Sequence, residues 1–254
     1  MSKWLRRLLA LGVALGLFVL LVVIPVGGSF LITDMPVRSP DLGSTDPESL
    51  GLGVIPVEFT SEDGVGLKGW WNPGEPDRPI IVFVHGLNRS RLELLERAVE
   101  SHIRGYGVLL FDFRTHGESD SAQMTLGVHE SRDVCAAGAY VARSASNRQV
   151  VLWGVSLGAS TALLASGRCQ GFGAVIADSS FLSLEETVSH HFRLLFGLPS
   201  FPIANLMIHA TRLRAGFDLA DGDVEGVIQS SPDLPILFIA GDRSYASGNC
   251  PATL

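Results

Sequence analysis

A serine stands between two glycines where an apolar, β-branched stretch ends. Residues 150–161 read VVLWGVSLGAST, and Ser156 is at the centre of a Gly-x-Ser-x-Gly pattern. An apolar strand before such a serine and an alanine- and leucine-rich helix after it predict a sharp strand-to-helix turn that only small neighbours tolerate. The helix N-terminus then places N–H groups and partial positive charge beside a developing oxyanion. Ser156 is therefore predicted to be a nucleophile; the alternative is a polar serine in a helix-start turn.

A second loop with suitable groups follows the apolar run Ile80–Val84 and reads His-Gly-Leu-Asn. The backbone N–H of Leu87 in this loop can complete an oxyanion hole whose other N–H belongs to Leu157, the residue after the serine. His85 lies in a strand-end loop well before Ser156, so we expect a structural imidazole there rather than a general base.

Apolar runs alternate with amphipathic stretches from residue 80 onward. The predicted strands are Ile80–Val84, Val108–Phe113, Val150–Val155, Ala174–Ala177 and Ile236–Ala240, and the predicted helices are Arg89–Ser101, Val128–Arg143 and Ala159–Ser166. This alternation implies right-handed crossovers and a mostly parallel sheet with helices on both faces. Two earlier runs, Val54–Thr60 and Val65–Trp71, flank Glu62-Asp63-Gly64 and predict an antiparallel hairpin at one edge.

The alternation stops between Ser179 and Pro235. That segment has no strand-like run, several aromatic residues and two proline breaks. We expect a helical lid at about residues 181–233, over the carboxyl ends of the strands; the alternative is ordinary helical packing on the sheet. The predicted organisation is an N-terminal anchor at 1–33, a Pro-, Gly- and Ser-rich linker at 34–53, and one α/β domain at 54–254.

The N-terminal segment is long enough to cross a bilayer. No charged residue occurs from Leu8 to Ile32, a stretch that spans about 37 Å as a helix. Lys3, Arg6 and Arg7 precede it, which predicts a cytoplasmic N-terminus and a translocated domain. A cleaved signal peptide is the alternative, with a small-residue cleavage site near Val26-Gly27-Gly28. The apolar run exceeds the usual length of a signal-peptide core, so an uncleaved anchor is preferred.

Composition excludes several classes of function. The chain of 254 residues carries a net charge of −7, which gives no electrostatic footprint for nucleic acid. Its three cysteines, Cys135, Cys169 and Cys250, have neither the spacing of a metal site nor a readable disulfide framework. We therefore expect no cofactor and no metal. The expected partners are a small-molecule or peptide substrate and, through the N-terminal helix, a membrane.

Five motifs in order resemble the α/β-hydrolase superfamily, and within it membrane-anchored relatives of serine aminopeptidases and prolyl-oligopeptidase-like hydrolases. They are VEFTSEDGVGLKGWWNPG, IVFVHGLNRS, LLFDFRTHGESD, GVSLGAS and LPILFIAGDR, and the resemblance extends from about Val54 to Asp242. It implies a hydrolase, of esterase or peptidase type, with a triad in the order serine, acid, histidine. By the same analogy His116 and Glu118 are structural.

The chain departs from the family pattern after its last predicted strand. The resemblance implies a triad acid where Ser244 stands; Asp242, two residues earlier, is the remaining candidate acid, and no histidine follows it. His190 and His191 in the expected lid are alternative bases, and Asp178 is an alternative acid, although a structural turn is the preferred interpretation of Asp178.

Three hypotheses follow from these residues. The first is a membrane-anchored serine hydrolase that cleaves an ester or amide bond through an acyl-enzyme on Ser156. The second is a truncated or frame-shifted product of such a gene, which the unpatterned sequence after Arg243 favours. The third is a non-catalytic homologue that binds an acyl ligand or a protein partner.

Overall fold

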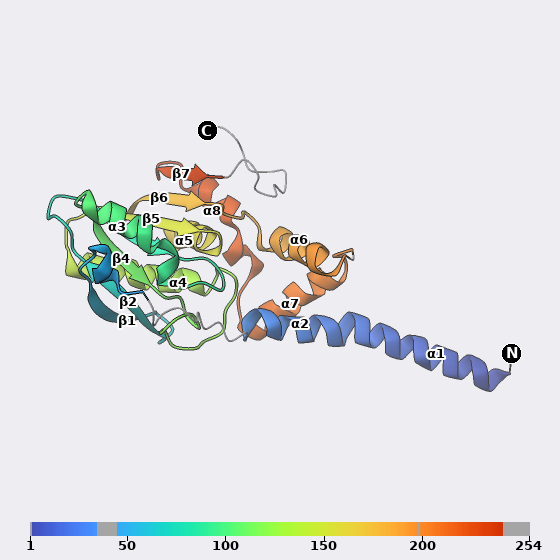
Figure 1. Cartoon of the computed structure of the whole chain (residues 1–254). Helices are drawn as coiled ribbons and strands as arrows, with labels where there is room; N and C mark the ends of the chain where they lie inside the picture. Colours follow the sequence, from blue (N-terminus) through green and yellow to red (C-terminus); the bar gives the residue numbers. More distant parts are fainter. Residues whose placement is uncertain (1, 35–44, 198, 241–254) are drawn as a thin grey trace.

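The computed structural model describes residues 2–34, 45–197 and 199–240, and a 7-stranded sheet forms its centre (Figure 1). The strands are β1 (Ile55–Thr60), β2 (Gly66–Asn72), β3 (Ile80–Val84), β4 (Gly107–Phe111), β5 (Val150–Val155), β6 (Phe172–Asp178) and β7 (Ile236–Ile239). Their order in the sheet is β1-β2-β4-β3-β5-β6-β7. Strands β3 to β7 run parallel, and the hairpin β1–β2 joins β4 antiparallel. The predicted fold, a mostly parallel sheet with an antiparallel N-terminal hairpin, is confirmed.

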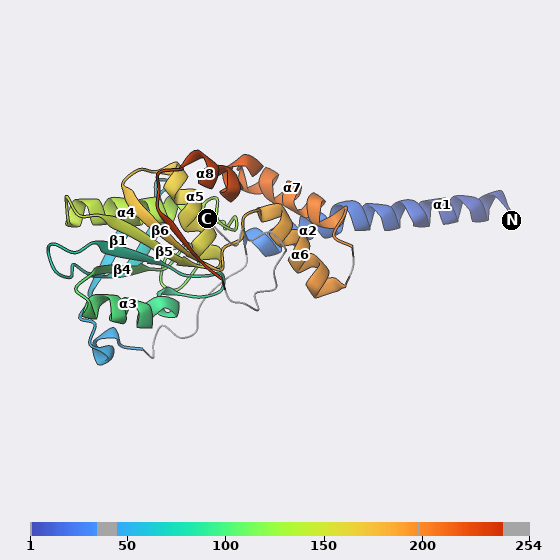
Figure 2. The ribbon, with the colours of Figure 1, turned by 90° about the horizontal axis from the view of Figure 1, so that it is seen from above.

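Helices cover both faces of this sheet. Figure 2 shows α3 on one face and α4, α5 and α8 on the other. The helical elements are α1 (Lys3–Phe18), the π-helical turn η1 (Val19–Val23), α2 (Ile24–Thr33), the 3-10 turns η2 (Pro47–Leu50), η3 (Arg91–Leu94) and η4 (Leu219–Gly222), and the helices α3 (Leu95–Ile103), α4 (Glu130–Ser144), α5 (Leu157–Arg168), α6 (Leu184–Phe196), α7 (Ile203–Ala215) and α8 (Val224–Ser230).

The central strand β3 explains why its sequence is uninterruptedly apolar. Ile81 and Phe83 pack into the core on the α3 face, whereas Val82 and Val84 pack into the core shared with α4 and α5. Successive side chains of a strand point to opposite faces, so a strand covered by helices on both sides needs apolar residues at every position.

The segment expected to form a lid divides into two parts. Helix α8 belongs to the main core, because Val224 is fully buried there and Val227 packs against that core. Helices α6 and α7 stand away from the sheet (Figure 2); α7 lies beside α2, and α6 packs against α7. The domain boundaries inferred from the sequence stay predictions.

A disulfide joins the two helices on one face of the sheet. Cys135 in α4 and Cys169 at the end of α5 are bonded to each other, with Cα atoms 5.9 Å apart. The sequence showed no readable disulfide framework, because three cysteines leave several pairings open. The fold selects this pair by packing α4 against α5.

We predict that replacing both bonded cysteines by serine lowers the free energy of unfolding by about 2–4 kcal/mol, since the cross-link restricts the unfolded chain. Denaturant unfolding under non-reducing conditions measures this difference. The matched control is Cys250→Ser, which leaves the pair in place and is expected to keep the parent midpoint. Equal midpoints for all three proteins would contradict the prediction.

Candidate active site

Ser156 occupies the single residue between β5 and α5. Its backbone angles are φ 53° and ψ −119°, a conformation that side-chain-bearing residues rarely adopt. Its N–H donates to the carbonyl oxygen of Asp178, at 2.8 Å, at the end of the neighbouring strand β6. The side chain is exposed to solvent. The turn therefore presents the Ser156 hydroxyl at the carboxyl edge of the sheet, above the N-terminus of α5.

The two glycines around Ser156 are required by close packing. A Cβ atom on Gly154 would collide with the backbone of Gly158, one turn into α5. A Cβ atom on Gly158 would in turn collide with the carbonyl oxygens of Val84 and His85 at the end of β3. The first turn of α5 thus lies directly on the backbone of β3, and this contact sets where the helix begins.

The loop after β3 lies next to the serine. A Cβ atom built on Gly86 would be 3.5 Å from the Cβ atom of Ser156. The N–H of Gly86 donates to the Glu93 carboxylate at 2.6 Å, so this amide is already used. Within the described residues, the N–H groups of Leu87 and Leu157 donate to no acceptor. Two amides that have no acceptor among the described residues therefore lie in the turn that carries Ser156 and in the neighbouring loop after β3, as the predicted oxyanion hole requires.

His85 supports this loop and has no free nitrogen. Its Nε2 accepts a hydrogen bond from the N–H of Phe113 (3.0 Å), so the proton is on Nδ1, which donates to the carbonyl of Gly86 (2.8 Å). Burial, reinforced by the neighbouring His116, lowers the pKa of His85 to about 3, and the ring stays neutral. The prediction of a structural imidazole is confirmed by these hydrogen bonds.

His116 and Glu118 also make structural contacts. The buried His116 ring packs edge-on against His85, and its Nδ1 is 2.9 Å from the carbonyl oxygen of Arg114. Glu118 forms an ion pair with the buried Arg91, which also pairs with Asp112 at 3.3 Å. These contacts hold the loop after β4 against the loop after β3.

The candidate acids and bases differ in what the structure shows of them. The carboxylate of Asp178 pairs with Arg97 of α3 at 3.0 Å, which matches the structural interpretation of this residue. The Nδ1 of His191 donates a hydrogen bond within its own helix to the carbonyl oxygen of Thr187 (2.8 Å), and the ring packs edge-on against His190. In the part of the chain that the structure describes, no histidine is hydrogen-bonded to the Ser156 hydroxyl. Asp242 and Ser244 lie outside the described residues.

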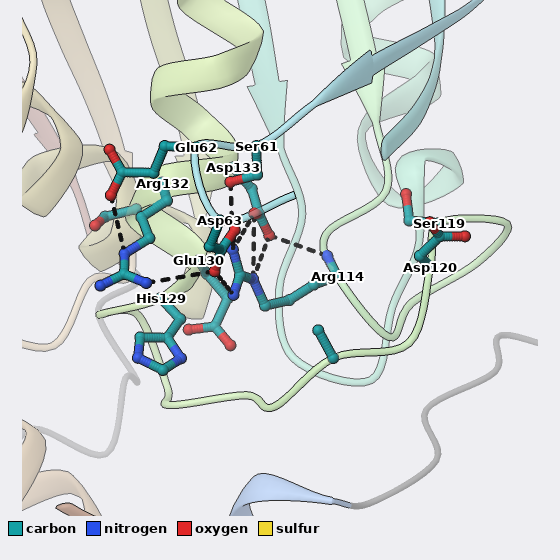
Figure 3. Close-up of polar contacts among 12 residues, drawn as sticks. Ser61, Glu62, Asp63, Arg114, Ser119, Asp120, His129, Glu130, Arg132 and Asp133 are labelled. Carbon is teal, nitrogen blue, oxygen red and sulfur yellow. Dashed lines mark hydrogen bonds and ion pairs between the residues drawn. The ribbon is translucent and has the colours of Figure 1, made fainter. Parts of the chain in front are cut away.

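A buried ion cluster on the hairpin side is not predicted by the sequence pattern (Figure 3). Arg114 donates to Asp133 of α4 at 2.6 and 3.0 Å and to Asp63 of the β1–β2 turn at 2.8 Å. Burial raises the pKa of Asp133 to about 6, whereas for the less buried Asp63 the hydrogen bonds from Arg114 outweigh burial and bring the pKa to about 2. The cluster fastens the loop after β4 to the hairpin and to α4. The sequence signals this cluster only through Arg114, which directly follows the predicted strand Val108–Phe113.

The structure shows no metal-binding site within residues 2–34, 45–197 and 199–240. No group of three or more His, Cys, Asp or Glu side chains there is arranged to hold a metal ion.

Comparison with known proteins agrees with this geometry. The sequence profile described as "Alpha/beta hydrolase family" matches residues 81–247. The uncharacterized protein YqkD of Bacillus subtilis is 28% identical over 73% of this chain and 60% of its own length. The uncharacterized protein YfhR of Escherichia coli is 29% identical over 74% of this chain and 62% of its own length. The chain thus spans about 60% of the length of these curated relatives.

Among solved structures, an esterase of Pyrococcus furiosus superposes with a TM-score of 0.59 at 22% identity, covering 78% of this chain and 86% of that one. A thioesterase domain from the curacin biosynthetic pathway superposes with a TM-score of 0.50 at 16% identity, over 75% and 84% of the two chains. At these identities the likeness shows the fold alone. The finer resemblance to aminopeptidase-like hydrolases stays a prediction.

We predict that Gly158→Ala lowers the free energy of unfolding by about 3 kcal/mol, because the added methyl group meets rigid backbone carbonyls at the end of β3. Urea unfolding of the purified chain measures the change. Gly53→Ala is the matched control, since a Cβ atom on Gly53 meets nothing within 4 Å. Equal stability of the two variants would show that α5 does not rest on the β3 backbone.

Proposed function

Because this chain belongs to the alpha/beta hydrolase family, we propose that it is a serine hydrolase that cleaves an ester or amide bond through an acyl-enzyme on Ser156. One observation carries the proposal: an exposed serine sits in a strained strand-to-helix turn between two unpaired backbone amides. Strain of this kind persists only where the surrounding structure enforces it, and it is concentrated at functional sites.

The proposed reaction begins with attack of the Ser156 Oγ on the substrate carbonyl carbon. The carbonyl oxygen becomes an oxyanion and accepts hydrogen bonds from the N–H groups of Leu157 and Leu87. The N-terminal end of α5 adds partial positive charge at the same place. Collapse of the tetrahedral intermediate breaks the bond to the leaving group, which takes up the proton given up by Ser156 and departs as the alcohol or amine. The acyl group stays on Ser156 until water attacks its carbonyl, releases the acid and returns a proton to the Ser156 oxygen.

A base must accept the hydroxyl proton before this attack becomes fast. Asp242 is the proposed acid partner of such a base, and no histidine follows it in these 254 residues. His85 cannot serve, since both of its nitrogens are hydrogen-bonded within the fold. The oxyanion hole and substrate binding alone typically give only ~10³–10⁴-fold acceleration over the reaction in water.

A second candidate function follows from the same observation. Two unpaired amides beside an exposed serine can bind a carbonyl or carboxylate oxygen without any base. A non-catalytic homologue that binds an acyl ligand, or a protein partner, would keep these amides and lose turnover. Turnover of an ester substrate therefore distinguishes the two functions.

We also propose that the N-terminal helix anchors the protein in a membrane, with the N-terminus cytoplasmic and the hydrolase domain on the other side. The continuous helix Lys3–Thr33 has 31 residues and a mean hydropathy of 2.9 in its most apolar window. Its basic residues lie before the apolar part, as expected for a cytoplasmic end. The bond between Cys135 and Cys169 supports a domain in an oxidising compartment.

We expect a fluorophosphonate probe to label Ser156 of this 254-residue chain slowly, because no base is hydrogen-bonded to its hydroxyl among the described residues. Gel fluorescence and mass spectrometry of the labelled peptide give the rate and the position. Ser156→Ala is expected to abolish labelling, and Ser230→Ala, at the exposed end of α8, is the matched control.

Replacing Ser244 by aspartate and appending a family-like strand, loop histidine and helix is expected to raise this labelling rate by orders of magnitude. Rapid labelling of the unextended chain would instead mean that another histidine is the base, and His190→Ala and His191→Ala would identify it. Labelling that persists in Ser156→Ala would overturn the proposed nucleophile.

Protease added to intact cells or spheroplasts is expected to digest the hydrolase domain and to spare the basic N-terminal arm, because the domain is proposed to be extracytoplasmic. Immunoblots against tags at the two ends follow the fragments, with a cytoplasmic protein as the control for lysis. Digestion of the domain only after lysis would refute the orientation.

A further inference from the structure

Helix α7 packs along α2, the part of the N-terminal helix nearest to the domain (Figures 1 and 2). Gly28 of α2 lies against Met207, where any Cβ atom would collide with the methionine side chain. Seven residues further along α7, Arg214 donates to Thr33 at 2.8 Å and pairs with Asp34 at 2.7 Å. The two helices therefore run parallel, and the offset in residue number between facing positions stays nearly the same from Gly28 to Asp34.

This register shows where the α6–α7 turn lies along the anchor. Equal helical steps back from the contact of Gly28 with Met207 place Ile203, the first residue of α7, at the level of Ile24. Phe201, in the turn just before the helix, then lies near the level of Val22 in η1. Helix α7 does contact η1 at this end. The turn between α6 and α7 therefore points along the N-terminal helix toward its charged arm and away from the sheet, as Figure 2 shows.

If the anchor spans the membrane as proposed, Val22, and with it the neighbouring α6–α7 turn, lies inside the hydrocarbon layer. A layer about 30 Å thick takes up roughly 20 helical residues, so a span that starts at Leu8 ends near Gly27. Phe201 then lies about 7 Å inside the boundary of the layer, at 1.5 Å of rise per residue. That depth is typical of segments that insert into one leaflet.

The chemistry of the turn suits this position. Leu194, Phe196 and Phe201 are largely exposed, with Phe201 at 77%. Between Arg193 and Arg212 the chain contains no aspartate, glutamate, lysine or arginine, although the protein as a whole is acidic. Large exposed apolar side chains mark an interaction surface, and an uncharged segment bordered by arginines is typical of one that contacts lipid.

The backbone of the turn is also compatible with a shallow position in lipid. Pro199 and Pro202 have no N–H to leave unpaired. The first turn of α7 is closed by hydrogen bonds from Ala204 to Ser200 (2.7 Å) and from Leu206 to Pro202 (3.0 Å). These described backbone groups thus have a partner or need none, whereas an unpaired N–H in lipid would be costly.

We propose that the tip of the α6–α7 hairpin, the turn that carries Phe201, is embedded in the membrane. It enters the leaflet on the side where the anchor leaves the membrane and joins the domain. The anchor and the tip then form one membrane-contacting unit, fastened by Arg214, and they hold the α6–α7 hairpin at the lipid surface. This inference rests on the proposed anchor but is independent of catalysis by Ser156.

The test uses the full chain with Cys250→Ser, so that a single added cysteine carries a polarity-sensitive fluorophore while Cys135 and Cys169 stay bonded. Phe201→Cys reports on the tip. Leu213→Cys is the matched control, because Leu213 is equally exposed (78%) on the same hairpin but lies at the level of Thr33, outside the membrane. Leu15→Cys reports on the middle of the anchor.

The labelled chains are reconstituted in phosphatidylcholine vesicles with or without phosphatidylcholine that carries a doxyl quencher near the headgroup. We expect the label at position 201 to lose most of its emission with the quencher and the label at position 213 to lose little. Quenching at 15 but not at 201 would overturn the proposal and leave the anchor standing. A label at 201 that emits as in an apolar environment but is not quenched would point to contact with a second copy of the chain, and it would also overturn the proposal. No quenching at 15 would remove the anchor and this inference together.

Discussion

The contact between the first turn of α5 and the backbone at the end of β3 determines the geometry of the candidate site. Because Gly158 has no side chain, α5 can begin directly on the carbonyls of Val84 and His85. The chain between β5 and this fixed helix has room for one residue, Ser156, which is held at positive φ. The same contact brings the loop after β3 next to the serine, so one packing constraint positions both the hydroxyl and the two unpaired amides.

A series of hydrogen bonds connects this site with the N-terminal helix. His85 accepts a hydrogen bond from Phe113, and the next residue, Arg114, is held by the buried Asp133. Further along the same loop, the N–H of Met124 donates to the carbonyl of Thr33 at the end of α2. The loop after β4 therefore touches the β3 loop at one end and the N-terminal helix at the other. The proposed anchor thus makes direct contacts with the folded domain, and the linker predicted at residues 34–53 stays a prediction.

The sheet and the serine turn could be predicted because local patterns determine them. Runs such as Ile80–Val84 are apolar at every position, and the small residues around Ser156 indicate a tight strand-to-helix turn whatever the role of the serine. The bond between Cys135 and Cys169, the ion cluster of Arg114 and the packing of α7 on α2 could not be predicted. Each depends on which distant elements become neighbours, and no local periodicity carries that information.

The central claim is that the backbone around Ser156 is already arranged to stabilise an oxyanion. A crystal structure of the chain after reaction with a fluorophosphonate tests it most directly, because the phosphonyl oxygen occupies the position of that oxyanion. We predict that this oxygen accepts hydrogen bonds of about 2.7–3.1 Å from the N–H groups of Leu157 and Leu87, with α5 unmoved. An adduct whose oxygen points into solvent, or a β3 loop that must rearrange to reach it, would contradict the account.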